Sequence, residues 1–176
     1  MNQIRLYGTL FVAGNLGGVF PIAGIPGVYK PDELSLWTES IVTSPNLHVL
    51  SAVLFAIGAV AGVLLASALF KGYRHAAVWL GLGSLWNALF IPLPLLLAEL
   101  SIQGLSVSPS VAEPMLLWAV LADALFNGCL AISMVIMART LWTSHRMLGI
   151  SGLIIAIPTF LVIGQFHARW AADLIG

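Results

Sequence analysis

Long apolar stretches separated by short polar segments occupy most of this chain. A transmembrane helix needs about 20 predominantly apolar residues, and the chain has five stretches near or above that length. They predict transmembrane spans at residues 6–28, 46–70, 73–98, 111–142 and 146–170. We therefore expect an all-α fold, in which residues 1–176 form one domain, an integral membrane bundle of five transmembrane helices.

Proline positions predict where these helices break. The first span contains Pro21, which lacks a backbone N–H and clashes with the preceding helical turn, so the helix should end or break nearby. Pro92 and Pro94 predict a kink in the third span, and Pro158 predicts one in the fifth.

Two sequence signals predict helix starts. Ser44 followed by Pro45 offers a capping oxygen and then a proline in the first turn. Ser110 and Glu113 have the S-x-x-E spacing of a capping box, which predicts the start of the fourth span.

Residues 29–43 form the longest polar segment of the first half. Within it Leu34, Trp37 and Ile41 recur near the spacing of one helix face. We expect a short helix after the first span that lies at the membrane interface, with Trp37 at the level of the lipid headgroups.

Composition supports a membrane protein. Hydrophobic residues make up 60% and charged residues only 8% of the chain, whereas soluble domains average about 25% charged residues. This balance excludes a soluble enzyme and also a nucleic-acid-binding protein, which would need a basic patch. Cys129 is the single cysteine, so neither an intramolecular disulfide nor a cysteine-based metal site is possible.

The charged residues separate by sign when five spans are assigned. One membrane face receives only basic residues, Arg5, Lys71, Arg74, Arg139 and Arg146. The other receives Lys30 and Arg169 with six acids, Asp32, Glu33, Glu39, Glu99, Glu113 and Asp173. Because positively charged loops stay cytoplasmic, we expect a bacterial inner-membrane protein with a cytoplasmic N-terminus and a periplasmic C-terminus.

Six of the seven acids are assigned to the outer membrane face, and Asp123 alone lies deep within a predicted span. Ionisable residues at that depth are functional candidates. Other polar residues come at similar depths, in the outer half of the membrane: Asn127, Asn87, Gln165, His167 and His48. They predict a polar pocket that opens outward. It could bind a quinone or lipid headgroup, or a b-type haem through His48 and His167. Alternatively, Asp123 simply joins helices through hydrogen bonds with Asn87, Asn127 or Gln165.

Two G-x-x-x-G motifs allow close approach of helix backbones. They are Gly14 with Gly18 in the first span and Gly58 with Gly62 in the second. Either these two spans pack on each other within one chain, or one motif forms a dimer interface.

Residues 123–160, DALFNGCLAISMVIMARTLWTSHRMLGISGLIIAIPTF, combine an apolar helix ending in arginine, a short basic loop and the helix start R-x-L-G-x-x-G-L-I. This helix-loop-helix resembles one found in a family of small bacterial polytopic inner-membrane proteins of unknown function. The resemblance implies a bacterial inner-membrane protein with no assigned activity.

No catalytic motif is present: the chain lacks a P-loop, G-x-S-x-G and H-E-x-x-H. We therefore expect an accessory or interaction subunit of a larger membrane assembly, in contact with the lipid bilayer and with a membrane-protein partner or a second copy. The alternative is a membrane-embedded binding protein for quinone or b-type haem, with the outer polar pocket as its site.

Overall fold

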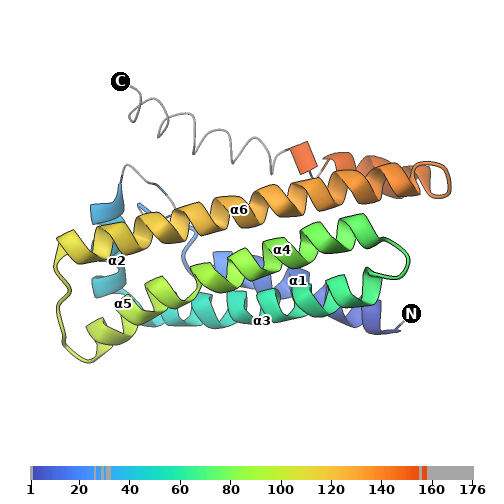
Figure 1. Cartoon of the computed structure of the whole chain (residues 1–176). Coiled ribbons are helices and arrows are strands. Elements are labelled where there is room, and N and C mark those ends of the chain that lie inside the picture. The colour runs from blue at the N-terminus through green and yellow to red at the C-terminus, as the bar shows by residue number, and fades with distance from the viewer. Residues whose placement is uncertain (1, 26, 29, 31–32, 155, 158–176) are drawn as a thin grey trace, which may run out of the picture.

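The computed structural model describes residues 2–25, 27–28, 30, 33–154 and 156–157. Six helices have defined bounds: α1 (Asn2–Val19), α2 (Leu34–Thr43), α3 (Pro45–Leu69), α4 (Arg74–Phe90), α5 (Pro92–Ile102) and α6 (Pro109–Leu141) (Figure 1). The backbone is helical again over residues 146–154. The described residues contain no strand, which confirms the predicted all-α fold.

Three helical stretches are long and apolar enough to cross a membrane: α3, α4 together with α5, and α6. They correspond to the predicted spans 46–70, 73–98 and 111–142. The other two predicted spans coincide with α1 and with the helix that begins at residue 146, whose predicted continuation to residue 170 lies mostly outside the described residues. The structure is therefore a helical bundle with three candidate membrane-spanning segments.

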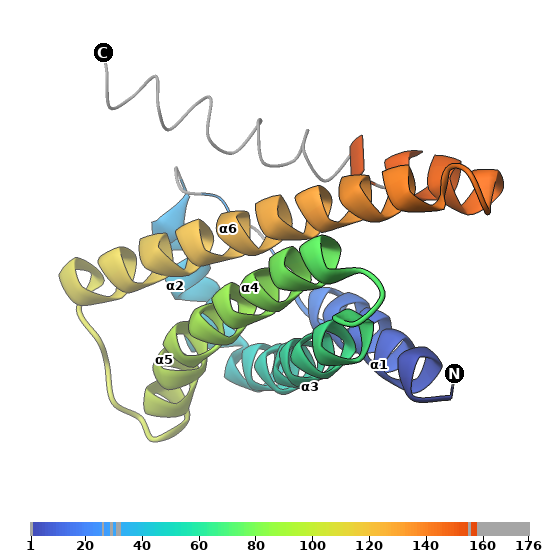
Figure 2. The ribbon, with the colours of Figure 1, turned by 45° about the vertical axis from the view of Figure 1, so that its right-hand side comes forward.

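Neighbouring helices of the bundle run in opposite directions. The Ser51 hydroxyl on α3 donates to the carbonyl of Gly18 on α1 at 2.6 Å, near the end of one helix and the start of the other. The Ser133 hydroxyl on α6 likewise donates to the carbonyl of Ala76 on α4 at 2.8 Å. Figures 1 and 2 show that α1 begins, α3 ends, α4 begins and α6 ends at the same end of the bundle.

The helix breaks predicted at prolines are confirmed where the structure describes them. Helix α1 ends at Val19, shortly before Pro21. Helix α4 ends at Phe90, and α5 starts at Pro92, because this proline has no N–H for the helical ladder. The kink predicted at Pro158 lies outside the described residues.

The predicted helix starts were only partly right. Pro45 is the first residue of α3, as predicted, but the Ser44 side chain makes no capping hydrogen bond. Helix α6 begins at Pro109, so the predicted capping box of Ser110 and Glu113 is wrong. A proline has a preset φ that suits the first helical position, and Pro109 moves the start ahead of Ser110.

Helix α2 lies against the other helices, and Trp37 contacts protein rather than lipid headgroups. Trp37 is 1% exposed and Ile41 is 2% exposed, both within the main core. The expected short helix is present, but the placement of Trp37 among headgroups is a correction. The apolar face of α2 is covered by α3, α5 and α6, so its helical spacing reflects packing inside the protein.

The G-x-x-x-G glycines lie at the contact of α1 with α3, within one chain. A Cβ added at Gly14 would stand 2.7 Å from the Cα of Gly58, and one added at Gly18 would stand 2.7 Å from the Phe55 ring. A Cβ at Gly62 would overlap the Ser84 hydroxyl of α4. These glycines therefore set the spacing of α1, α3 and α4.

Gly14→Val should destabilise the bundle, because the added side chain meets the backbone of α3 and cannot be accommodated by a rotamer change. Overpacking of this kind costs about 1–3 kcal/mol. Gly8→Val on the same helix is the matched control, since no neighbour lies within 4 Å of a Cβ there. Thermal unfolding in detergent should show a lower Tm for Gly14→Val alone; equal Tm values for the two variants would contradict this interface.

Candidate functional site

The structure separates the polar residues that were expected to share one pocket. His48 pairs with α2, Asn87 pairs with α1, and Asp123 pairs with Asn127 along α6. Gln165 and His167 lie outside the described residues. Only Asp123 and Asn127 are brought together as predicted, so the described residues form three small polar groups rather than one.

His48 is buried in the first turns of α3, with 3% of its surface exposed. Its Nε2 lies 3.1 Å from the Ser40 hydroxyl of α2, and that hydroxyl donates to the Trp37 carbonyl at 2.7 Å. Because a hydroxyl has one hydrogen, Ser40 accepts the second bond and the imidazole donates from Nε2. His48 thus joins α2 to α3 through this hydrogen bond.

A small cavity adjoins His48. Its volume is about 10 Å³, which is about the space needed for one water molecule. Its lining is mostly apolar: Ile22, Trp37, Ser51, Ala52, Phe55, Phe90 and Pro94. Binding of a haem or a quinone beside His48 would therefore require the helices around this cavity to move apart.

The second group is a pair of asparagines that joins α1 to α4. Asn87 is 1% exposed, and its Nδ2 donates to Asn15 Oδ1 at 2.8 Å. Asn15 in turn donates from Nδ2 to the Phe11 carbonyl at 2.8 Å. Within the described part of the chain, Asn87 Oδ1 has no hydrogen-bond partner.

Sequence reasoning missed Asn15, although its signal is visible. It is an amide between Gly14 and Leu16 in an otherwise apolar stretch. Its side chain crosses α3 at Gly58, where an added Cβ would stand 2.6 Å from Asn15 Nδ2. The missing side chain of Gly58 therefore makes room for the amide that reaches Asn87.

The third group lies along one helix. Asn127 Nδ2 donates to the backbone carbonyl of Asp123 at 2.9 Å and to Asp123 Oδ2 at 3.1 Å. The expected bond between Asp123 and Asn127 is present, whereas Asn87 donates to Asn15 instead of Asp123. Both residues belong to α6, so these bonds do not join α6 to another helix.

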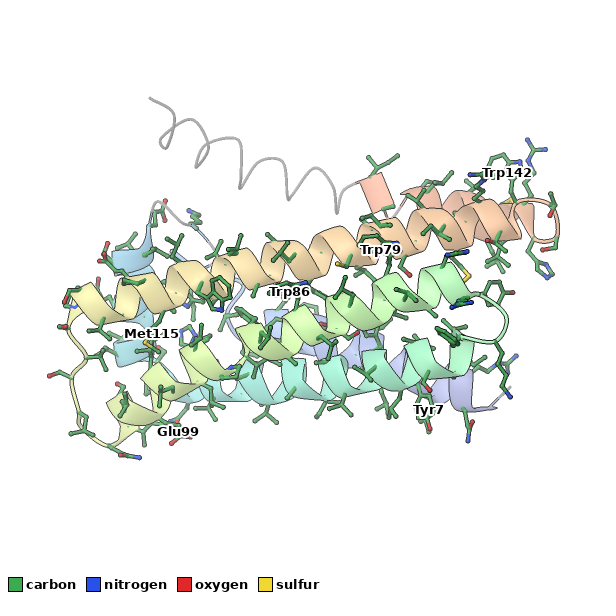
Figure 3. The ribbon with its side chains drawn as sticks, viewed as in Figure 1. Tyr7, Trp79, Trp86, Glu99, Met115 and Trp142 are labelled. Carbon is green, nitrogen blue, oxygen red and sulfur yellow. The ribbon has the colours of Figure 1, made fainter. Side chains whose placement is uncertain are left out.

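Charged side chains gather at the two ends of the bundle. Arg5, Lys71, Arg74, Arg139 and Arg146 are exposed at the end where α6 finishes. The other end carries Glu33, Glu39, Glu99 and Glu113, and there Lys30 Nζ lies 3.0 Å from Glu33. Figure 3 shows Tyr7 and Trp142 at the first end and Glu99 and Met115 at the other. The described residues thus keep bases and acids apart, with Lys30 as an exception.

No family model matches this chain, and neither the curated proteins nor the solved structures contain a match. The resemblance of residues 123–160 to small bacterial membrane proteins therefore remains a prediction. Among the described residues, no three His, Cys, Asp or Glu side chains are grouped as a metal site. The geometry of the polar groups is thus suited to hydrogen bonding between and along helices.

The Asn15–Asn87 bond should stabilise the bundle measurably. We expect a coupling energy of about 0.5–1.7 kcal/mol, the range of hydrogen bonds between transmembrane helices. A double-mutant cycle of Asn15→Leu and Asn87→Leu measures it from free energies of unfolding in mixed micelles. A cycle of Asn15→Leu with Asn127→Leu is the control, because Asn127 bonds within α6. Additive effects in the first cycle would contradict a bond between α1 and α4.

Proposed function

We propose that this protein is a five-span subunit of the bacterial inner membrane that acts by packing its helices within a larger membrane assembly. The observation that carries this proposal is how little chain lies between the helices. Apart from residues 20–33 between α1 and α2, the connections between the long helices are short, at residues 70–73, 103–108 and 142–145. A partner would therefore meet mainly the faces of transmembrane helices.

The outward faces of these helices are apolar. On α3 the exposed side chains Val53, Ile57 and Val60 recur at helical spacing. On α4 the corresponding set is Val78, Leu82, Leu85 and Leu89. Such faces can contact either lipid tails or another apolar helix. Which of the two they contact depends on how well the van der Waals packing fits.

Polar groups inside the bundle form hydrogen bonds between helices, which supports a structural role for the interior. Ser51 and Ser133 each donate to a carbonyl of a neighbouring helix, and Asn87 donates to Asn15. Each of these bonds holds one helix against another, which favours a structural role for the interior.

Two observations support five crossings. Helix α1 packs antiparallel to α3, at the Gly14–Gly58 contact and the Ser51–Gly18 hydrogen bond, so it lies alongside a candidate membrane span. The helix that begins at residue 146 turns back along α6, since added Cβ atoms at Gly149 and Gly152 would meet Ala138. This return is the start expected for a fifth span over residues 146–170.

Tryptophan substitutions on the outward faces test the assembly. Val53→Trp and Val60→Trp on α3 are compared with Val78→Trp and Leu85→Trp on α4. We expect one pair to abolish a complex seen by native electrophoresis, because the larger ring separates packed helices, while the other pair faces lipid and leaves the complex intact. The Tm of each purified variant should match the wild type, since all four residues are exposed.

Two results would contradict this function. One is a wild-type protein that migrates as an 18.7-kDa monomer after mild solubilisation from its own membrane. The other is a Soret band or an extractable quinone that is lost in His48→Ala, which would favour the cofactor-binding alternative.

Cysteine labelling tests the orientation. In a Cys129→Ser background, Gln103→Cys and Gly176→Cys should react with a membrane-impermeant maleimide on intact spheroplasts, whereas Ser144→Cys should react only after lysis. We expect the Ser144 end in the cytoplasm because basic residues gather there and the positive-inside rule favours bases on that side. Labelling of Ser144→Cys from outside would reverse the orientation. If Gln103→Cys and Gly176→Cys differ in accessibility, the fifth crossing is wrong.

A further inference from the structure

Exposed basic side chains gather at the end of the bundle where α1 begins and α6 finishes. This basic end consists of Arg5, Lys71, Arg74, His75, Arg139, His145 and Arg146. The described residues around it, 2–8, 68–78 and 137–150, contain no Asp or Glu. The single salt bridge among the described residues, Lys30–Glu33, lies at the opposite end. The basic end therefore presents cations without a carboxylate to neutralise them.

Two of these cations stack on exposed aromatic rings. The Arg146 Cζ lies 5.5 Å from the centre of the Trp142 ring, and the Arg74 Cζ lies 5.6 Å from that of Phe70. Trp142 is 42% exposed and Phe70 is 45% exposed. A guanidinium that lies over a ring still has N–H groups available for a phosphate.

The turn that follows α6 and the start of the next helix join a cation to an apolar surface. Arg146 is followed by Met147 and Leu148, which are 76% and 59% exposed. Residues 142–148 thus offer an aromatic ring, a guanidinium and two large exposed apolar side chains. A ligand that suits all three has an anionic head and a hydrocarbon tail.

We propose that residues 142–148, together with Arg139, bind an anionic phospholipid at the membrane surface. The Arg146 guanidinium and the Arg139 charge contact the phosphate, the Trp142 ring lies at headgroup level, and Met147 and Leu148 contact the acyl chains. This proposal requires a membrane-embedded bundle but no partner protein, so it goes beyond the proposed subunit function.

Native mass spectrometry of the purified full chain measures the binding. Phosphatidylglycerol and phosphatidylcholine with identical acyl chains are the probes. Each basic residue near an anionic surface contributes about 1 kcal/mol, so removing one should weaken phosphatidylglycerol binding about 5-fold. We expect Arg146→Gln to lose about 5-fold and the double variant Arg139→Gln/Arg146→Gln to lose about 25-fold. Phosphatidylcholine affinity should stay the same.

Matched controls separate a site from bulk charge. Lys30→Gln removes a base at the opposite end and should leave the phosphatidylglycerol affinity unchanged. Arg74→Gln removes the other stacked guanidinium, on α4, and should have less effect than Arg146→Gln. Each variant must keep the wild-type Tm in lipid-free detergent, which is expected for exposed side chains.

Equal affinity for the two lipids, or an equal loss in Lys30→Gln and Arg146→Gln, would overturn the proposal. Inorganic phosphate is the test for a free-anion site, because millimolar phosphate that displaces phosphatidylglycerol completely would show that the acyl chains contribute nothing. Retained lipid selectivity with no native complex would contradict the proposed subunit function alone. A native complex without lipid selectivity would contradict only the lipid site.

Discussion

The contact between the backbones of Gly14 and Gly58 is the constraint on which the rest of the bundle depends. Neither residue has a side chain, so α1 lies against α3 at a distance that no larger residue permits. At that distance the Ser51 hydroxyl reaches the Gly18 carbonyl, and the Asn15 amide passes Gly58 to meet Asn87 on α4. A wider spacing would separate each donor from its acceptor and leave buried polar groups unpaired, which is costly inside a membrane.

The described polar residues of the predicted pocket do not converge, because each bonds to a partner close to it. His48 bonds to Ser40, and Asn87 bonds to Asn15. Asn127 donates to a carbonyl of its own helix. These short-range bonds use the polar atoms to hold helices, and the outward faces of α3 and α4 remain apolar. A protein built this way interacts with its surroundings through its apolar faces and its charged ends.

The two ends of the bundle differ in chemistry. One end has exposed bases, two of them over aromatic rings. The other has the carboxylates of α2, α5 and α6 together with the Lys30–Glu33 pair. The positive-inside rule associates such a basic end with the cytoplasmic side of a membrane. This charge asymmetry is the basis of both the proposed orientation and the proposed lipid site.

Local features of the sequence were enough to predict the helices, the breaks before Pro21 and Pro92, and the gathering of charges at the two ends. The helices follow from hydrophobic runs, the breaks from missing N–H groups, and the charged ends from the positions of the charges. Each of these features acts within a few residues. Only the tertiary structure decided that Trp37 is buried and that Asn15 pairs with Asn87. These outcomes depend on how each helix is rotated and which neighbour covers it. Depth along a helix can be counted from the sequence, whereas the direction in which a side chain points across the bundle is set by packing, here by the glycines between α1 and α3.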